Sequence, residues 1–392
     1  MRIGIDGSCW SNRRGFGRFT RCLVEELAQR FPDDEWLLLL DRVSADDPDL
    51  PALPAGVDVR TVAVDRAPSR AASADGSRSL RDVARMSLAG RSAQCDAFFF
   101  PASYSWFPVP GTPTVVTVHD AIAERHSELV FPSRAHQLRW KLKEGLAVRC
   151  AAMLLTVSQA SRAAVTETLR VSPDRLRVIR EAPAAGFRHV PEEERAASLG
   201  RLDVDPDVPY FLYVGGISPH KNLLVLVEAF SAVASRHSEV RLLLAGDAED
   251  DPFLSSAGSV RAALAASAAR DRISLLGFVA DDDLAALYSG AVATALPSID
   301  EGFGLTAAES AACGTPVVAS RRPALVGLLG PAGVYADPSS ADDFAAALER
   351  LLSDEGARRS AAGACADLAA TWSWADAAAT TREVLGAVAA RG

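Results

Sequence analysis

Short apolar runs alternate with longer Ala- and Leu-rich segments of helical character along almost the whole chain. The runs predict strands at residues 2–6, 36–40, 57–64, 97–100, 115–118 and 153–157, and again at 210–214, 240–245, 273–276, 293–296, 316–319 and 334–336. Several runs, such as residues 37–40, are apolar throughout, which is typical of parallel strands covered by helices on both faces. The two successive sets predict an α/β protein with two Rossmann-like, doubly wound parallel sheets.

A polar stretch between the two sets predicts a domain boundary. Residues 187–209 are acidic around Glu192, Glu193 and Glu194 and contain prolines near Asp207. We therefore expect an N-terminal domain over residues 1–190, a linker over 191–208 and a C-terminal domain over 209–371. The segment 66–79 is predicted as a loop of the first domain.

Composition narrows the classes of partner. The chain has 392 residues and a formal net charge of −9, which argues against nucleic acid as a partner. The six cysteines form no CxxC pair and have no His at metal-ligand spacing, which indicates apolar fillers in a reducing compartment and no metal site. The N-terminus does not resemble a signal peptide, and no apolar run reaches the length of about 18 residues that spans a membrane. We therefore expect a cytoplasmic protein without a transmembrane segment.

The segment from Glu301 to Glu309 carries the strongest chemical signal. A helix starting near Phe303 would place Glu309 on its core-facing stripe. A buried carboxylate is costly unless something hydrogen-bonds it, and a pair of ligand hydroxyls could do so. Gly302 and Gly304 leave backbone N–H groups bare at the helix N-terminus, where an anion can bind. The alternative is structural: an acid at position 300 or 301 caps the helix and Glu309 meets a buried Arg.

A second motif, Gly-Gly-Ile-Ser-Pro-His-Lys-Asn at residues 215–222, follows another predicted strand. Lys221 would stand at the N-terminus of the next helix, where its charge adds to the positive end of the helix dipole. A bound diphosphate would relieve this unfavourable arrangement. The alternative is that Lys221 points into solvent.

Two further motifs lie in the first domain. His119 and Asp120 close a predicted strand, where His119 could donate to a sugar hydroxyl or a leaving oxygen and Asp120 could orient it or meet an acceptor. A structural role for the His is the alternative. Gly15, Gly17 and Arg18 precede a predicted helix. These glycines come too late after the first strand for a dinucleotide fingerprint, so they predict a loop that reaches over a ligand.

These motifs together resemble glycosyltransferase family 4, whose members are retaining enzymes of the GT-B fold. The resemblance is most specific over residues 210–338, through segments 215–222, 276–279, 297–309 and 312–320. The first domain is similar more loosely, at residues 15–18, 119–120 and 157–162. The resemblance implies two domains that face a cleft, with the acceptor in the first and the donor in the second. It also implies that a last helix, 372–392, crosses back to the first domain, and packing on the second domain alone is the alternative.

Each motif acquires a role from this resemblance. Glu309 would hold the ribose hydroxyls of the donor, and Lys221 would contact its diphosphate. Glu301 would meet the transferred sugar, with His119 near the sugar hydroxyls or the glycosidic oxygen. The base would be read at Gly277, Phe278 and Val279, and the remaining donor contacts are assigned to Gly216, His220, Gly302, Phe303, Gly304 and Leu305. The catalytic set would be His119, Asp120, Lys221 and Glu301, and the phosphate or acceptor loop would be Gly15, Gly17 and Arg18.

One departure from the family affects the diphosphate site. Close relatives often carry an Arg before the Lys, and this chain has His220 there. The second cation could come from His220, Arg18 or another Arg, or backbone donors could hold the diphosphate instead.

The implied function is transfer of a hexosyl group from a UDP- or GDP-sugar to an acceptor hydroxyl, with retention of configuration and with no metal or other cofactor. Two other classes stay open: a nucleotide-sugar epimerase of the same architecture, and a non-catalytic nucleotide-sugar-binding homologue. The acceptor could be a saccharide, a lipid-linked molecule or a small molecule. The basic segment 136–149 is interpreted either as a peripheral membrane contact with anionic lipid or as the solvated face of a helix.

Overall fold

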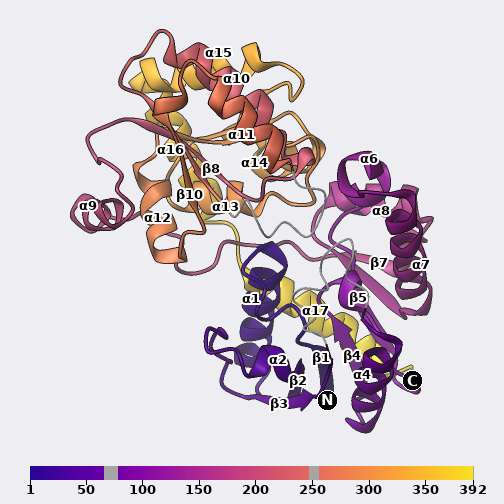
Figure 1. Cartoon of the computed structure of the whole chain (residues 1–392). Coiled ribbons are helices and arrows are strands. Elements are labelled where there is room, and N and C mark those ends of the chain that lie inside the picture. Colours follow the sequence, from indigo (N-terminus) through magenta and orange to yellow (C-terminus); the bar gives the residue numbers. More distant parts are fainter. Residues whose placement is uncertain (66–77, 247–255, 392) are drawn as a thin grey trace. The chain divides into compact units, whose positions relative to one another are not determined.

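The computed structural model describes residues 1–65, 78–246 and 256–391. The chain forms two compact units, Met1–Glu181 with Ser373–Gly392, and Ala182–Trp372. Each unit is built on one parallel sheet flanked by helices (Figure 1). Both doubly wound sheets expected from the sequence are therefore present.

The sheet of the first unit has seven parallel strands in the order β3-β2-β1-β4-β5-β6-β7. The strands are β1 (Arg2–Asp6), β2 (Glu35–Asp41), β3 (Val57–Val62), β4 (Ala97–Phe100), β5 (Thr114–Thr117), β6 (Met153–Thr156) and β7 (Leu176–Val178). The strand order reverses between β1 and β4. The carboxyl ends of these two strands therefore flank a topological switch point, where open α/β sheets bind ligands.

Helices cover both faces of this sheet, because right-handed crossovers on the two sides of the switch point lead to opposite faces. They include α1 (Gly15–Arg30), α2 (Arg42–Ala45), α4 (Leu80–Ser92), α5 (Ile122–Arg125), α6 (Ser127–Val130), α7 (Arg134–Cys150) and α8 (Gln159–Leu169). Met86 of α4, Val148 of α7 and Val165 of α8 share one buried core cluster with the strands. These three helices therefore lie on the same face.

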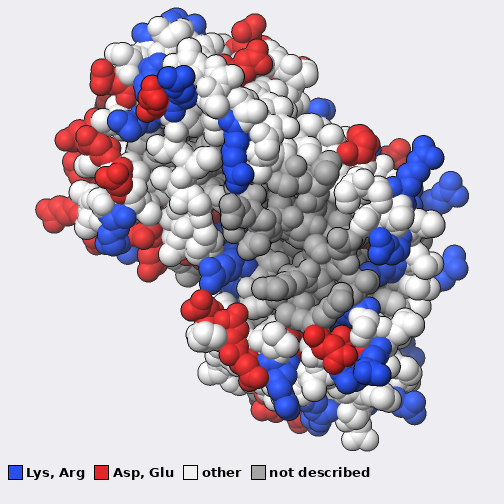
Figure 2. All heavy atoms as spheres, in the orientation of Figure 1, with Lys and Arg blue, Asp and Glu red and all other residues white. Residues whose placement is uncertain are grey.

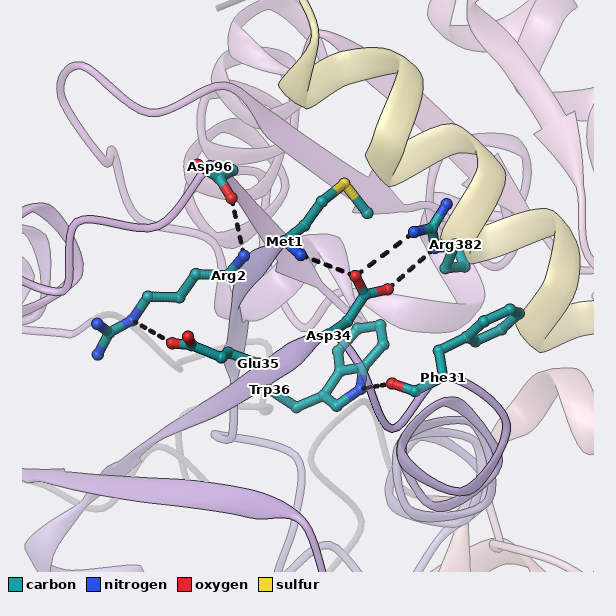
Figure 3. Close-up of polar contacts among 8 residues, drawn as sticks. All are labelled: Met1, Arg2, Phe31, Asp34, Glu35, Trp36, Asp96 and Arg382. Atoms are coloured by element: carbon teal, nitrogen blue, oxygen red, sulfur yellow. Dashed lines mark hydrogen bonds and ion pairs between the residues drawn. The ribbon is translucent and has the colours of Figure 1, made fainter.

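The last helix, α17 (Trp374–Ala389), belongs to the first unit, where it packs against α1. Its Arg382 Nε lies 2.9 Å from Asp34 Oδ2, and the Met1 amine lies 2.8 Å from Asp34 Oδ1 (Figure 3). Asp34 is buried and stands just before β2. A charged contact thus joins the end of the chain to its beginning.

The sheet of the second unit has six parallel strands in the order β10-β9-β8-β11-β12-β13. The strands are β8 (Tyr210–Val214), β9 (Arg241–Ala245), β10 (Ile273–Gly277), β11 (Ala293–Leu296), β12 (Val317–Ser320) and β13 (Val334–Ala336). The helices include α9 (Glu192–Arg201), α10 (Leu223–Ala234), α11 (Ala257–Ala266), α12 (Asp281–Gly290), α13 (Leu305–Ala312), α14 (Pro323–Leu329), α15 (Ala341–Ser353) and α16 (Glu355–Ala369). Its switch point lies between β8 and β11.

The segment expected as a linker contains a helix. Three glutamates occupy the first turn of α9, where negative charge favours a helix N-terminus, so this acidic run is a helix start. Leu199 of α9 is fully buried in a core cluster with residues of α12. Residues 182–208 therefore pack with the second unit. In addition, the sequence does not predict β7, because Arg177 interrupts its short apolar run. Residues 66–77 of the expected loop lie outside the described residues.

Candidate active site

Glycines stand at the carboxyl ends of β8, β9 and β10, and backbone hydrogen bonds of these glycines join the strand ends. The Gly215 N–H donates to the Ala245 carbonyl at 3.0 Å, and the Gly246 N–H donates to the Gly277 carbonyl at 2.8 Å. All of these residues lie at the ligand-binding edge of a parallel sheet. Because glycine has no side chain, a ligand can approach the backbone closely at this edge.

Two loops at the switch point of the second sheet are joined by hydrogen bonds. A short 3₁₀ turn, Pro219–Lys221, follows β8. The side-chain amide nitrogen of the next residue, Asn222, donates to the carbonyls of Pro297 and Pro338, at 3.0 and 2.7 Å. The Ile299 N–H donates to the His220 carbonyl at 2.8 Å. The loop that carries Lys221 is therefore held against the loop after β11.

This arrangement brings Lys221 and Glu301 together. Lys221 Nζ lies 2.7 Å from Glu301 Oε1, and the Ser298 hydroxyl donates to the same oxygen at 2.7 Å. Burial alone would raise the pKa of Glu301, but the charge and hydrogen bond of Lys221, with the Ser298 hydrogen bond, lower it below its ordinary value. Glu301 is thus a charged carboxylate. The alternative that Lys221 points into solvent is wrong, because it has a carboxylate partner.

A glycine stands at the N-terminus of α13, so the N-cap residue makes no side-chain cap. The N-cap is Gly304, with φ of +96°, and the helix begins at Leu305, two residues after the expected start at Phe303. A Cβ at Gly304 would lie 2.6 Å from Leu325 Cδ2, so both the backbone conformation and the space require glycine. Neither Asp300 nor Glu301 therefore occupies the N-cap position of α13. Gly304 itself has no side chain that could accept from the first N–H groups of the helix.

Glu309 is fully buried on α13, as its position on the core-facing stripe predicted. The hydroxyl of Tyr288 donates to Glu309 Oε2 at 3.1 Å, a partner that the sequence did not indicate. Burial, together with the charge of Glu309, raises the pKa of nearby Cys313 to about 12. The contact of Glu309 with a ribose stays a prediction.

The tripeptide expected to read a base stands at the end of β10. Gly277 is the last residue of the strand, and Val279 is buried. Phe278 between them is 52% exposed. An exposed phenyl ring at the carboxyl edge of a sheet offers a flat surface on which a base could stack.

In the first unit, Gly15, Gly17 and Arg18 lie in the first turn of α1. A Cβ at Gly17 would lie 1.8 Å from the Asn12 carbonyl oxygen, so this close contact requires glycine. Arg21 supports the same loop by donating to the carbonyls of Trp10 and Asn12, at 2.6 and 3.0 Å. The N-cap, Arg14, makes no side-chain cap, so this helix start also presents N–H groups.

His119 lies just after β5 with partners on both ring nitrogens. Nε2 is 2.9 Å from the Pro101 carbonyl, which can only accept, so Nε2 carries the hydrogen. Nδ1 is 3.4 Å from Glu181 Oε1. The rings of Phe16 and Phe19 stand edge-on to the imidazole, with centroids at 4.8 and 4.6 Å. Sequence reasoning missed Glu181, because nothing in its local pattern connects it with His119.

The expected neighbour of His119, Asp120, has a local role. Its Oδ1 accepts the Ile122 N–H at 2.9 Å, at the start of α5. A different buried carboxylate, Asp6, ends β1. Arg78 donates to the Ser8 hydroxyl and lies 3.7 Å from Asp6 Oδ1. Among the described residues, Asp6 Oδ2 and Arg78 Nη1 are buried without a hydrogen-bond partner. In the sequence, the only signal for the Asp6–Arg78 pair is the position of Asp6 at a strand end.

In the part of the chain that the structure describes, no three His, Cys, Asp or Glu residues are grouped so that they could bind a metal ion. Independence from metal stays a prediction. The described helices include none that is long and apolar enough to cross a membrane.

Curated relatives are glycosyltransferases. The chain is 29% identical over 278 residues to a D-inositol 3-phosphate glycosyltransferase of Rhodococcus jostii, a match covering 67% of this chain and 59% of that protein. It is 30% identical over 264 residues to the O-antigen chain mannosyltransferase B of Escherichia coli, covering 66% of each. The matches thus span less than two thirds of the length of these relatives.

Solved structures of glycosyltransferases share the fold. A sucrose-phosphate synthase of Thermosynechococcus elongatus superposes with a TM-score of 0.79 at 19% identity, covering 100% of both chains. Anabaena HepE in complex with UDP-glucose superposes with a TM-score of 0.73 at 19% identity, covering 99% of this chain and 100% of that one. At these identities the likeness shows the fold alone, which is GT-B.

Family models match both units. Residues 14–181 match the model of Glycosyltransferase Family 4, and residues 208–354 match that of Glycosyl transferases group 1. The two matches together span most of the chain, including all strands of both sheets except β1. The chain is a member of glycosyltransferase family 4, with the GT-B fold.

Proposed function

We propose that this protein transfers a hexosyl group from a nucleotide-diphosphate sugar to an acceptor hydroxyl, with retention of anomeric configuration and without a metal ion. The observation that carries the proposal is the Lys221–Glu301 ion pair, which stands three residues before the uncapped N-terminus of α13. A cation, a charged carboxylate and bare N–H groups lie at one edge of a parallel sheet. These are the groups that recognise phosphates and sugar hydroxyls.

The leaving diphosphate is the group that most needs stabilisation during transfer. Negative charge develops on it as the glycosidic bond breaks, and Lys221 with the N–H groups at the start of α13 can neutralise that charge. Removal of one such donor typically raises the barrier by about 3 kcal/mol. Position 220 carries a His where close relatives often have an Arg, so His220, Arg18, another Arg or these N–H groups would supplement Lys221.

Glu301 positions the transferred sugar in this proposal. The lowered pKa of Glu301 keeps it ionised, so it accepts hydrogen bonds from sugar hydroxyls and does not supply a proton. A covalent sugar trapped on Glu301 of the wild-type protein would contradict this positioning role. Glu309 holds the ribose hydroxyls, and Phe278 contacts the base.

The acceptor hydroxyl is assigned to the first unit, at the end of β1. One hydroxyl could donate to Asp6 Oδ2 and accept from Arg78 Nη1, so a single alcohol group would satisfy both buried atoms. Burial of such atoms without partners is unfavourable. His119 and the Gly15–Arg18 turn follow strands of the same sheet.

The relatives support a nucleotide-sugar donor. Anabaena HepE was solved with UDP-glucose, and a curated relative is named for D-inositol 3-phosphate. For this chain we propose a UDP- or GDP-sugar and leave the acceptor class open. An epimerase would consume the donor without any acceptor, and a non-catalytic homologue would bind the donor without releasing nucleoside diphosphate.

A donor panel tests the proposal. Wild type is mixed with UDP-, GDP- and dTDP-sugars, and thermal stabilisation and nucleoside diphosphate release are measured with and without EDTA. Glu309→Ala should abolish the stabilisation, whereas Glu193→Ala, which removes an exposed glutamate of the same unit, should retain it. The anomeric configuration of the product is read by NMR. Absence of stabilisation by every donor in the folded protein would reject the proposal.

A further inference from the structure

Four leucines on two helices of the first unit are unusually exposed. Among the described residues, the four most exposed large hydrophobic side chains are Leu80 (89%), Leu138 (70%), Leu88 (67%) and Leu142 (65%). Leu80 and Leu88 belong to α4, and Leu138 and Leu142 belong to α7. Single exposed leucines are ordinary on a protein surface, but a concentration of this kind marks an interaction site.

The spacing places these leucines in rows. Leu138, Leu142 and Leu146 of α7 recur every fourth residue, and so do Leu80, Ala84 and Leu88 of α4. Side chains four residues apart stand on the same face of a helix. Leu146 is 45% exposed. Each helix therefore carries a continuous apolar row on its outer side.

The opposite sides of both helices are already used for the core. Met86 of α4 and Val148 of α7 are buried in one cluster against the same face of the first sheet. The outer rows thus belong to one layer of the unit, and packing within the unit does not cover them. We call the outer sides of α4 and α7 the leucine surface.

The charges of the leucine surface have one sign. Exposed cations flank the leucine rows: Arg81 and Arg91 on α4, and Arg134, Arg139, Lys141 and Arg149 on α7. The acids of these two helices, Asp82 and Glu144, are both buried, and burial with the nearby Glu124 raises the pKa of Glu144 well above its ordinary value. Figure 2 shows Lys and Arg side chains along the edge of the unit that carries α7 in Figure 1.

This local charge is opposite to that of the chain as a whole, which has a net charge of −9. An isologous dimer through this surface would place its cations against the same cations of the second copy, which is poor charge complementarity. Leucines between arginines and lysines are instead the pattern of a helix that lies in the interface of an anionic bilayer. There the leucines contact the acyl boundary, and the cations contact anionic headgroups.

We propose that the leucine surface binds the protein to anionic lipid membranes. The inference does not depend on the reaction proposed above, because it uses no residue of the candidate active site. It implies that the protein works at a membrane surface, peripherally, held by α4 and α7.

The test is flotation of the full chain with phosphatidylcholine vesicles that contain or lack phosphatidylglycerol. Wild type should float with the anionic vesicles and remain unbound with the neutral ones. The triple variant L138Q/L142Q/L146Q should bind the anionic vesicles at least about tenfold more weakly, because it removes the apolar row. Its fold should persist, since all three side chains are exposed.

A charge variant and a control sharpen the result. R139Q/K141Q/R149Q should also lose binding at least about tenfold, and added salt should weaken wild-type binding. The matched control is L224Q/L275Q, which changes two exposed leucines of the second unit and should bind as wild type. Binding that survives both surface variants would overturn the proposal. Failure of wild type to bind anionic vesicles would also overturn it. In that case, a dimer in sedimentation that L138Q/L142Q/L146Q dissociates would identify the leucine surface as a contact between two copies of the chain.

Discussion

Lys221 and Glu301 form an ion pair across two loops of the second unit, with 2.7 Å between Nζ and Oε1. The loops follow β8 and β11, which are neighbours at the switch point of the sheet. The cation thus obtains its counter-charge from tertiary structure. The pair holds Lys221 in place before the donor binds. A diphosphate that arrives would then compete with Glu301 for the lysine.

Replacement of Lys221 by Ala should lower kcat/KM for the sugar donor ~100-fold or more, because loss of one donor to developing negative charge has an effect of this size. Nucleoside diphosphate should also bind more weakly. Steady-state kinetics and calorimetry measure the two effects. Arg270→Ala removes an exposed cation of the same unit and serves as the control. Unchanged kcat/KM in a folded Lys221→Ala protein would refute the assignment.

The same pair predicts a dependence of stability on pH. The pKa of Glu301 is lowered in the folded state, despite burial, by Lys221 and Ser298. The contribution of ionised Glu301 to the free energy of unfolding is therefore complete above the ordinary Glu pKa of about 4.3. It is lost as pH falls through the lower pKa of the folded state. The unfolding free energy of wild type, measured with urea, should fall in this acid range. Lys221→Ala should show a smaller or opposite slope, because Glu301 then has burial without a cation.

Tyr288→Phe should weaken nucleoside diphosphate binding less than Glu309→Ala does. The tyrosine hydroxyl donates to Glu309 Oε2 and orients it, whereas Glu309 itself is assigned to the ribose. We expect ~3-fold for Tyr288→Phe and ~10-fold or more for Glu309→Ala. Tyr335→Phe, which removes a hydroxyl bonded to the Gly330 carbonyl, is the control. Equal affinity for all four proteins would show that Glu309 does not contact the nucleotide.

A double-mutant cycle tests whether Glu181 acts through His119. Glu181 Oε1 lies 3.4 Å from His119 Nδ1, so Glu181→Ala should reduce kcat by loosening the imidazole. In a His119→Ala background the same change should have little further effect. The expected coupling energy is about 1 kcal/mol or more. Additive effects on kcat would mean that Glu181 has no positioning role. Rescue by Glu181→Gln would show that the contact with His119 does not need the charge of Glu181.

Asp34→Asn and Arg382→Ala should each destabilise the protein by about 2 kcal/mol, because each leaves a partner of a charged hydrogen bond unsatisfied. Burial would raise the pKa of Asp34, but Arg382 and the N-terminal amine lower it. The stabilisation is therefore present above the ordinary Asp pKa and is lost as pH falls through the lower folded value. The unfolding free energies of wild type and Asp34→Asn, measured with urea, should approach each other as the pH falls into this acid range. Arg391→Ala, near the end of the same helix, should have no effect.

Much of the fold could be predicted because the signals are local. Uninterrupted apolar runs such as residues 37–40 identify buried parallel strands, and their alternation with helical segments identifies a doubly wound sheet. The acidic run at residues 192–194 predicts a linker but begins α9, because helix starts and linkers share a polar, acidic composition. Only the packing of Leu199 in the core separates the two.

The residues at the strand ends could be identified from the pattern along the chain, because each of Lys221, Glu301 and His119 follows an apolar run. The burial of Glu309 could be predicted from its place on a helical stripe. Their partners could not be predicted, because packing brings Glu301 to Lys221, Tyr288 to Glu309 and Glu181 to His119. The tertiary structure also decided which leucines of α4 and α7 remain exposed. The reason is physical: periodicity records which face of an element is apolar, whereas a hydrogen bond or an exposed row depends on which other elements pack beside it.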